Sequence, residues 1–212
     1  MSISGFRPLS PAALAREVSQ RCLATQREAE VVRVAVDGAD AAVPGALADA
    51  VAALLREQGR PCVRVSLAHW LRPASVRLEH GHTDPESYRH GWFDLGALGR
   101  EVLDPLGPSG NGQWLPTLWD PVRDRATRAR REQAGPATVL LVDGPMLLGR
   151  SLPFELTVHL HLSAAALHRR TPPEQRWTLP ALLEHENEAR TDDVADLLVR
   201  AEHADRPALR AR

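Results

Sequence analysis

The residues between a predicted strand and a predicted helix near the N-terminus follow the layout of a phosphate-binding loop. Such a loop reads G-x-x-x-x-G-K-[S/T]. Its backbone N–H groups surround the phosphates, its lysine neutralises them and its hydroxyl holds Mg²⁺. Here an apolar strand over 31–37 leads into Gly38, and a helical pattern over 46–56 begins at the required distance. The spacing therefore predicts a phosphate loop over 38–45.

Three diagnostic positions of this loop hold other residue types. Val43 replaces the second glycine and resists positive φ, Pro44 replaces the lysine and lacks an N–H, and Gly45 has no hydroxyl. All 26 Lys and Arg residues are arginine, whose planar guanidinium is not equivalent to a compact ammonium. We interpret Gly38, Asp40, Val43, Pro44 and Gly45 as a degenerate phosphate loop. The alternative is an ordinary strand-to-helix turn with proline near the first helical position.

Apolar and amphipathic runs alternate along the chain. Strands are predicted at 31–36, 62–67, 138–142, 156–162 and 194–199. Helices are predicted at 46–56, 95–103, 164–170 and 179–190, and a helix capped by Ser10 is predicted to run to about residue 28. This alternation indicates an α/β fold with a parallel sheet flanked by helices on both faces. Ligands bind such sheets at the carboxyl ends of the strands, where 38–45, 68–73 and 143–144 would converge.

The length of 212 residues fits one α/β domain. We expect an N-terminal helical extension over 1–30, a single domain over 31–207 and a tail over 208–212. The Pro-, Gly- and Trp-rich stretch 104–124 indicates an inserted loop or hairpin that could cover a ligand. A basic run follows it and is predicted to be a solvated helix face, with phosphate binding as the alternative. Its members are Arg123, Arg125, Arg128, Arg130 and Arg131.

Composition excludes several classes of function. The net charge of −1 argues against general nucleic-acid binding and favours a small or protein partner. No stretch reaches about 18 apolar residues, and the N-terminus lacks the apolar core of a signal peptide, so we expect a cytoplasmic protein that does not span a membrane. Cys22 and Cys62 have no metal or redox spacing and are expected to be buried, reduced thiols.

Further segments extend the match beyond the loop. They are 63–73 (VRVSLAHWLRP), 84–88 (DPESY), 93–94 (FD), 103–110 (LDPLGPSG), 119–120 (WD) with Asp124, and 140–148 (LLVDGPMLL). In this order and spacing, the chain resembles the bacterial uridine-kinase-like branch of the P-loop kinases over roughly 31–207. The resemblance implies the three-layer P-loop kinase-like architecture with an extra N-terminal helix. It also implies transfer of phosphate from ATP or GTP, with Mg²⁺, to the 5′-hydroxyl of a pyrimidine nucleoside.

The resemblance also marks candidate catalytic residues and their losses. Ala68 stands where the family has its catalytic acidic residue, whose carboxylate accepts the proton of the nucleoside hydroxyl. His69 could act as the base in its place, or it could be structural. Asp143 matches an acidic residue that could face Mg²⁺ or cap a helix. The lid is shortened to 171–175, and three nearby arginines are candidates for phosphate contact. They are Arg169, Arg170 and Arg176.

Other matched positions point to a nucleoside pocket, with a structural role as the alternative for each. They are Arg72, Tyr88, Asp94, Trp119 and Asp120. The histidines at 80 and 82, near His69 and His90, invite a metal hypothesis. They lack a partner cluster of known ligand geometry, so exposed loop histidines are the preferred interpretation.

These observations lead to three hypotheses about function. The first is a uridine-kinase-like protein that no longer transfers phosphate and acts by binding a nucleoside, a nucleotide or a protein partner. The second is an active ATP-dependent uridine/cytidine-type phosphotransferase that uses arginines, with ATP and Mg²⁺ as cofactors. The third is a structural or interaction subunit that self-associates or docks through its tryptophans.

Overall fold

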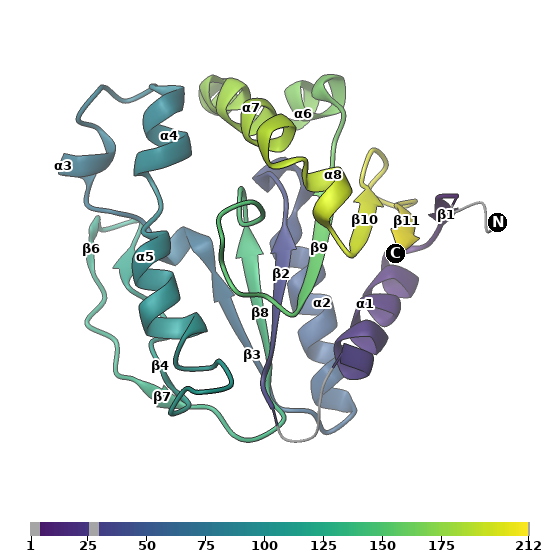
Figure 1. The fold of residues 1–212 in the computed structure, drawn as a ribbon. Helices are drawn as coiled ribbons and strands as arrows, with labels where there is room; N and C mark the ends of the chain where they lie inside the picture. Colours follow the sequence, from purple (N-terminus) through teal and green to yellow (C-terminus); the bar gives the residue numbers. More distant parts are fainter. Residues whose placement is uncertain (1–4, 26–29, 212) are drawn as a thin grey trace.

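A seven-stranded sheet forms the centre of the computed structural model, which describes residues 5–25 and 30–211 (Figure 1). The strand order is β1-β11-β10-β9-β2-β8-β3. The five strands from β10 to β3 are parallel, and β11 and β1 add an antiparallel edge. The strands are β1 (Arg7–Pro8), β2 (Val32–Asp37), β3 (Cys62–Ser66), β8 (Val139–Gly144), β9 (Leu156–His161), β10 (Leu197–Arg200) and β11 (Ala208–Ala211).

Helices cover both faces of the sheet, as predicted. They are α1 (Pro11–Thr25), α2 (Pro44–Glu57), α3 (Ala74–Arg77), α4 (Pro85–Gly91), α5 (Leu95–Leu98, continued by a π-helical turn over Gly99–Leu103), α6 (Ala164–Arg170), α7 (Leu179–Ala189) and α8 (Thr191–Val194). Ser10 caps α1, because its Oγ accepts a hydrogen bond from the N–H of Ala13 at 3.2 Å. The part of the predicted first helix over 26–28 lies outside the described residues. No helix among the described residues has the length and apolar character needed to cross a membrane.

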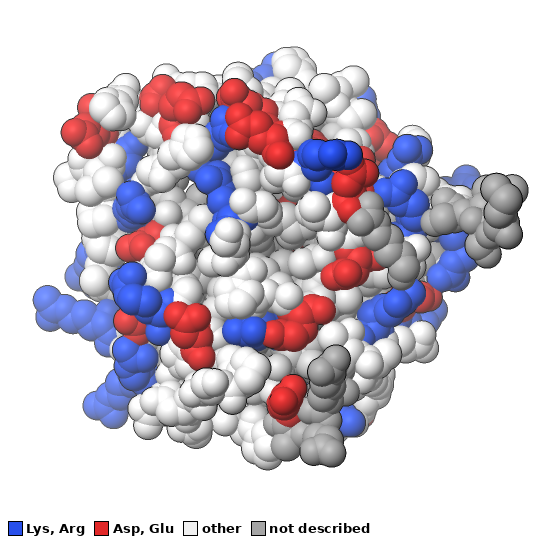
Figure 2. All heavy atoms as spheres, viewed as in Figure 1, with Lys and Arg blue, Asp and Glu red and all other residues white. Residues whose placement is uncertain are grey.

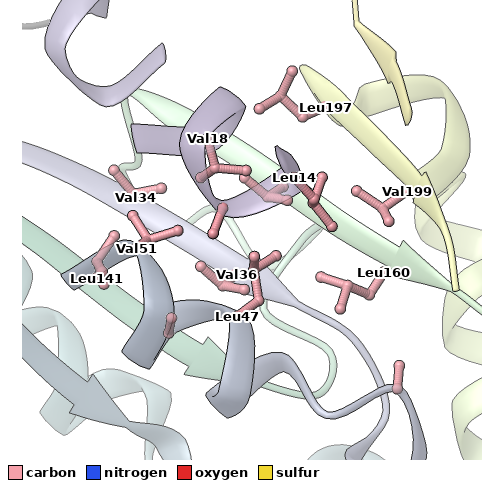
Figure 3. Close-up of a cluster of buried hydrophobic side chains, with 14 of the residues drawn as sticks. Leu14, Val18, Val34, Val36, Leu47, Val51, Leu141, Leu160, Leu197 and Val199 are labelled. Carbon is pink, nitrogen blue, oxygen red and sulfur yellow. The ribbon is translucent and has the colours of Figure 1, made fainter. Parts of the chain in front are cut away.

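Alternate residues of β2 supply the two hydrophobic cores. Val34 and Val36 face α1 and α2, where they pack with Val18 and Leu47 (Figure 3). Ala35 faces the opposite core, which α5 and its π-helical turn complete. Because both faces of the strand are buried, its β-branched residues need no polar alternation. Strand β2 therefore has a fixed position, and so do the residues that follow its carboxyl end.

The Pro- and Trp-rich insertion and the basic run after it form two short antiparallel strand pairs, so the helix predicted for the basic run is wrong. Strand β5 (Trp119–Asp120) pairs with β6 (Arg125–Ala126), and β4 (Gln113–Trp114) pairs with β7 (Glu132–Gln133). The Asp120 carboxylate accepts hydrogen bonds from the N–H groups of Val122 and Arg123, which bends the chain into a turn instead of a helix. The arginines of the run are exposed. Blue side chains project from the left of Figure 2, the side on which β6 and β7 lie in Figure 1.

Two boundaries near the C-terminus differ from the prediction. The tail predicted over 208–212 is wrong for Ala208–Ala211, which form β11 and pair with both β10 and β1. Leu209 is buried in the core, which explains why this segment joins the sheet. The last parallel strand begins at Leu197 and not at Val194, because residues 191–194 form α8. The helical extension is also part of the core, since α1 buries Leu14 and Val18.

Cys22 and Cys62 are free and buried, as predicted. Burial raises the pKa of the Cys22 thiol to about 12 and that of Cys62 to about 11. Both thiols therefore stay protonated near neutral pH.

Candidate active site

The 38–45 loop and the ends of β3 and β8 meet at the carboxyl edge of the sheet, as the sequence predicted. The N–H of Gly38 donates to the carbonyl of Gly144 at 3.1 Å. A Cβ placed on Gly144 would lie 2.5 Å from Cβ of Leu67, so the segment after β3 packs tightly against the end of β8. This edge is the expected location of a ligand site in a parallel sheet.

The 38–45 loop is folded on itself. Its residues Asp40–Ala42 form a 3₁₀ turn. The N–H groups of Ala42, Val43 and Ala46 donate to carbonyls at positions 39, 40 and 43, at 2.8, 2.9 and 3.0 Å. Those three donors are satisfied within the loop and its junction with α2, and Pro44 has none to offer. The loop therefore has fewer donors free for a phosphate than the spacing alone suggests.

Val43 adopts the left-handed conformation just before α2, with φ 53° and ψ 51°. Its side chain is 57% exposed. It lines an apolar groove of about 380 Å³ together with residues of α1 and α2, among them Leu14 and Leu47. The loop thus offers a hydrophobic surface at a position where a phosphate loop has a glycine.

Arg64 of β3 fills the space at the start of α2. Its Nε donates to Oδ1 of the buried Asp143 at 2.8 Å, and its Nη1 is paired with Asp49 on α2. A Cβ added to Gly45 would lie only 2.7 Å from Arg64 Nη2 and 3.3 Å from Asp143 Oδ2. The guanidinium therefore lies directly against position 45, where a phosphate loop has the hydroxyl that holds Mg²⁺.

Arg72 lines a second cavity, of about 90 Å³, whose wall includes Met146 just after the carboxyl end of β8. Arg89 and Arg150 line it as well, with Phe93 and Met146 as apolar neighbours. The Nε atoms of Arg89 and Arg150 are buried and have no hydrogen-bond partner among the described residues. Burial, followed by the nearby Arg89 charge, lowers the pKa of Arg150. Arg89 is paired with Glu184 at 3.1 Å and with Glu188, so Arg72 and Arg150 are the arginines of this cavity that favour an anionic ligand.

Two other predicted pocket residues, Tyr88 and Asp94, do not line this cavity but lie beside residues that do. Tyr88 is buried and makes edge-on contacts with Trp92, Phe93 and Trp177 at ring-centroid distances of 5.2, 5.7 and 5.6 Å. Asp94 caps α5, because its Oδ1 accepts a hydrogen bond from the Ala97 N–H at 2.8 Å. Packing and capping therefore account for both side chains.

Trp119 and Asp120 lie in the β5–β6 hairpin. Trp119 donates through Nε1 to Asp124 Oδ1 at 3.0 Å, and Asp120 stabilises the hairpin turn. Neither is among the described residues that line the Arg72 cavity. Of the five predicted nucleoside residues, the structure brings Arg72 into the wall of this cavity, whereas Asp120 lines a separate cavity of the β5–β6 hairpin with Arg123 and Arg125.

A cluster that the sequence analysis did not single out lies on the other side of Asp37, the last residue of β2. Asp37 accepts a hydrogen bond from the Leu147 N–H at 2.7 Å and contacts His159 Nδ1 through Oδ2 at 2.6 Å. His159 Nε2 is 3.3 Å from Glu186 Oε1, and His161 Nδ1 is paired with the same carboxylate. Asp192 of α8 lies beside both imidazoles.

The charges of this cluster stabilise one another. Burial alone would lower the pKa of His159, but its hydrogen bonds to Asp37 and Glu186 outweigh burial and raise the pKa to about 9. The hydrogen bond to Glu186 also raises the pKa of His161. Burial opposes ionisation of Glu186, yet the two histidines lower its pKa to about 2. The pattern His159-x-His161 within a predicted strand was the available signal, because residues i and i+2 face the same side.

Comparisons with known proteins agree on the fold. No family model matches the chain, and no curated protein matches it. A solved structure described as a possible uridine kinase from Bacillus stearothermophilus superposes with a TM-score of 0.71 at 16% identity, over 87% of this chain and 96% of that one. A putative fructose transport system kinase from Silicibacter sp. TM1040 gives 0.59 at 24% identity, over 88% and 95%. The YGR205w protein gives 0.58 at 9% identity, over 96% and 99%.

The chain has a P-loop kinase-like fold. A complete phosphate loop holds the phosphates and Mg²⁺ with its backbone N–H groups, its lysine and its hydroxyl, and the corresponding segment here is 38–45. The residues present do not fit these groups. Position 44 lacks the ammonium, position 45 lacks the hydroxyl, and the carboxylate of Asp143 is bonded to Arg64.

The candidate base and two of the three phosphate-side arginines have local partners. His69 is half-buried, and its Nδ1 lies 3.4 Å from the carbonyl oxygen of Trp119. Arg170 donates to the carbonyls of Ala201 and Glu202 at 2.9 and 3.3 Å, and Arg176 donates to that of Thr171 at 3.3 Å. Arg169 is exposed on α6.

The histidines at 80, 82 and 90 are exposed, as predicted. Of the tryptophans considered for docking to a partner, Trp114 is buried, and Trp92 and Trp119 are half-buried. Trp114 is 3% exposed, and Trp92 contacts Tyr88 and Trp177.

Proposed function

We propose that this protein uses the P-loop kinase-like fold to bind a small anionic ligand at the Arg72 cavity and does not transfer phosphate. The observation that carries the proposal is the position of Arg64, whose guanidinium lies against Gly45 and is bonded to Asp143. Phosphoryl transfer depends almost entirely on positioning and charge neutralisation, so a site that lacks the lysine, the hydroxyl and a free carboxylate lacks most of the catalyst.

The nature of the ligand is inferred from the charge of the cavity. Arg72 and Arg150 supply guanidinium groups, Phe93 supplies an aromatic ring beside them, and the charge of the third arginine, Arg89, is offset by Glu184 and Glu188. Guanidinium groups bind phosphate and carboxylate oxygens in pairs. The names of the structural neighbours, a possible uridine kinase and a putative fructose transport system kinase, suggest a nucleoside or a sugar. We therefore propose a phosphorylated nucleoside or sugar as the ligand.

A ligand panel tests this proposal. Thermal-shift and calorimetric titrations would compare uridine and cytidine with UMP, CMP, fructose phosphate and ATP·Mg²⁺. We expect at least one monophosphate to bind, about tenfold more weakly in Arg72→Ala and Arg150→Ala and unchanged in the exposed control Arg60→Ala. We expect no binding of ATP·Mg²⁺. ATP-dependent phosphorylation of uridine or cytidine that is lost in Asp143→Asn would overturn the proposal.

The second candidate is an active phosphotransferase in which Arg64 replaces the missing lysine, with ATP and Mg²⁺ as cofactors. The proximity of Arg64 to Gly45 favours it. Against it, Asp49 and Asp143 already offset the Arg64 charge. If Arg64 is the loop cation, Arg64→Ala abolishes ATP turnover.

A rebuilt loop separates the two candidates further. The triple variant Val43→Gly, Pro44→Lys, Gly45→Ser would restore the phosphate-loop residues. In the non-transferring protein, Arg64 obstructs the new Ser side chain, so ATP·Mg²⁺ should bind at least about tenfold more tightly when Arg64→Ala is added. If Arg64 assists the phosphate, adding Arg64→Ala should weaken binding instead.

A further inference from the structure

Three chain segments bring four metal-ligand side chains to one point beside the 38–45 loop. His159 and His161 extend from the same face of β9, Glu186 lies on α7 and Asp192 lies on α8. One ligand atom from each lies within 4.8 Å of all the others. In Figure 1, α7 and α8 lie near the carboxyl end of β9, which is how residues distant in sequence meet. Two imidazoles and two carboxylates form a donor set suited to a divalent transition metal.

The separations of the donor atoms match a small metal ion. Ligands about 2.0–2.1 Å from a tetrahedral Zn²⁺ are about 3.3 Å from one another. His159 Nε2 lies 3.3 Å from Glu186 Oε1, and His161 Nδ1 lies 3.3 Å from Asp192 Oδ1. His159 Nε2 and Asp192 Oδ1 are 3.9 Å apart. The His161–Glu186 pair is closer, and these two groups would have to separate slightly to admit an ion.

The surroundings of the ligands are also those of a metal site. Asp37 contacts Nδ1 of His159, which leaves Nε2 directed at the cluster. A carboxylate behind a histidine is the usual outer shell of a zinc-bound imidazole. Asp192 Oδ1 is a buried atom that accepts no hydrogen bond from any described residue. A cavity of about 30 Å³, roughly the space of one water molecule, adjoins His159 and Glu186.

The charge balance favours a cation at this point. Three carboxylates, Asp37, Glu186 and Asp192, face two imidazoles. With neutral imidazoles, a divalent ion would offset most of the negative charge. Without an ion, both imidazoles must be protonated, so that their positive charges offset those of the carboxylates. These two states make opposite predictions about metal content.

We propose that His159, His161, Glu186 and Asp192 bind one Zn²⁺ ion in a closed, four-ligand site that joins α7 and α8 to β9. Four protein ligands leave no open position, so the role of the ion is structural. Arg190, with φ 49° and ψ 48°, forms the turn between α7 and α8 that places Asp192 opposite Glu186. The site is independent of the proposed function, because Arg72 and its cavity contribute none of the ligands.

The experiment uses the full chain without a histidine tag. The protein is stripped with a chelator and dialysed, and Zn²⁺ is titrated against a chromophoric competitor, with total metal measured by mass spectrometry. We expect one equivalent of Zn²⁺ per chain and a higher Tm with the ion. Co²⁺ loaded in place of Zn²⁺ should give the strong visible absorption of a four-coordinate site.

Matched variants assign the ligands. His161→Ala and Asp192→Ala should lose both the absorption and the rise in Tm. Asp37→Asn should keep one equivalent but bind about 10–100-fold more weakly, as expected for an outer-shell partner. His168→Ala, an exposed histidine on α6, should match the wild type.

Two results would overturn the site. One is a folded wild-type protein, checked by circular dichroism, that takes up well under one equivalent of Zn²⁺ and gives no Co²⁺ absorption. Protons alone would then hold the cluster. The other is unchanged Zn²⁺ affinity in both His161→Ala and Asp192→Ala.

Discussion

The two sides of Asp37 differ in what their charged groups do. On one side, at the 38–45 loop, Arg64 is paired with Asp49 and Asp143, and its guanidinium fills the space beside Gly45. On the other side, donor atoms from β9, α7 and α8 lie within 4.8 Å of one another, and a small cavity adjoins His159 and Glu186. The same strand end therefore adjoins a site closed by an ion pair and a site whose imidazoles and carboxylates converge on one another.

This difference shows that the fold and the chemistry at its edge are separable. The hydrophobic residues of β2 hold the loop backbone in place whatever its side chains are, so the spacing of a phosphate loop persists without its lysine and hydroxyl. The same rigid strand also holds Asp37, whose carboxylate positions His159. A strand end that has lost one kind of binding group can therefore support another.

The largest effect is expected from Asp37→Ala, which tests whether the convergent side depends on this carboxylate. The substitution removes the acceptor for the Leu147 N–H and leaves the buried His159 without its closest anionic partner. Breaking a buried ion pair costs about 3–5 kcal/mol, and we expect a loss of at least about 3 kcal/mol in urea unfolding with chelator present.

The exposed Asp205→Ala provides the control and should change the unfolding free energy by less than about 0.5 kcal/mol. Asp37→Asn keeps an acceptor oxygen and should fall between the two. Equal stability of Asp37→Ala and Asp205→Ala would mean that the cluster does not depend on Asp37.

An intermediate effect is expected at the closed side, from Arg64→Ala. The substitution leaves Asp143, which is 4% exposed, without its 2.8 Å hydrogen-bond donor. Hydrogen bonds to charged groups contribute about 1.5–3 kcal/mol, so we expect a loss of about 2 kcal/mol in chemical unfolding.

A double-mutant cycle with Asp143→Ala isolates the pair and should give a coupling energy of about 1 kcal/mol or more. Arg60→Ala, an exposed arginine, serves as the control. A coupling energy near zero would mean that Asp143 is free, which would strengthen the case for a metal-assisted transferase.

The parallel core could be predicted from the sequence because its signals are local. The runs that became β2, β3, β8 and β9 are rich in Val and Leu, and short apolar runs of this length are typical of buried parallel strands. The edge strand β11 was missed because it spans only four residues, Ala208–Ala211, and its alternation becomes clear only when β10 lies beside it. A hairpin in the insertion was predicted, but its turn depends on one side chain, Asp120, which accepts hydrogen bonds from the N–H groups of Val122 and Arg123.

The site could be predicted only in part, because its geometry depends on contacts between distant residues. The sequence located the loop, but the position of Arg64 depends on Asp49 and Asp143, 15 and 79 residues away along the chain. His159-x-His161 was a visible signal. Its partners Glu186 and Asp192 lie on α7 and α8, and the turn at Arg190 sets how these helices are placed relative to each other. The hydrophobic pattern of the sequence does not predict that placement.

The smallest effect concerns the backbone of the closed loop, at Val43. A β-branched residue at φ 53° is strained, and the left-handed conformation costs an ordinary residue about 1–2 kcal/mol. Asparagine tolerates this conformation better, and the side chain is 57% exposed, so Val43→Asn should stabilise the protein by about 0.5–1 kcal/mol. For a chain of this length, that corresponds to a rise in Tm of about 1–4 °C, measurable by calorimetry.

The control Val122→Asn changes a valine that is 91% exposed and has negative φ, so it should leave Tm unchanged. A lower Tm for Val43→Asn would show that packing of Val43 in the groove with Leu14 and Leu47 outweighs its backbone strain. The valine would then stabilise the closed loop by hydrophobic contact. A glycine at this position of a phosphate loop instead leaves the backbone open to the phosphate.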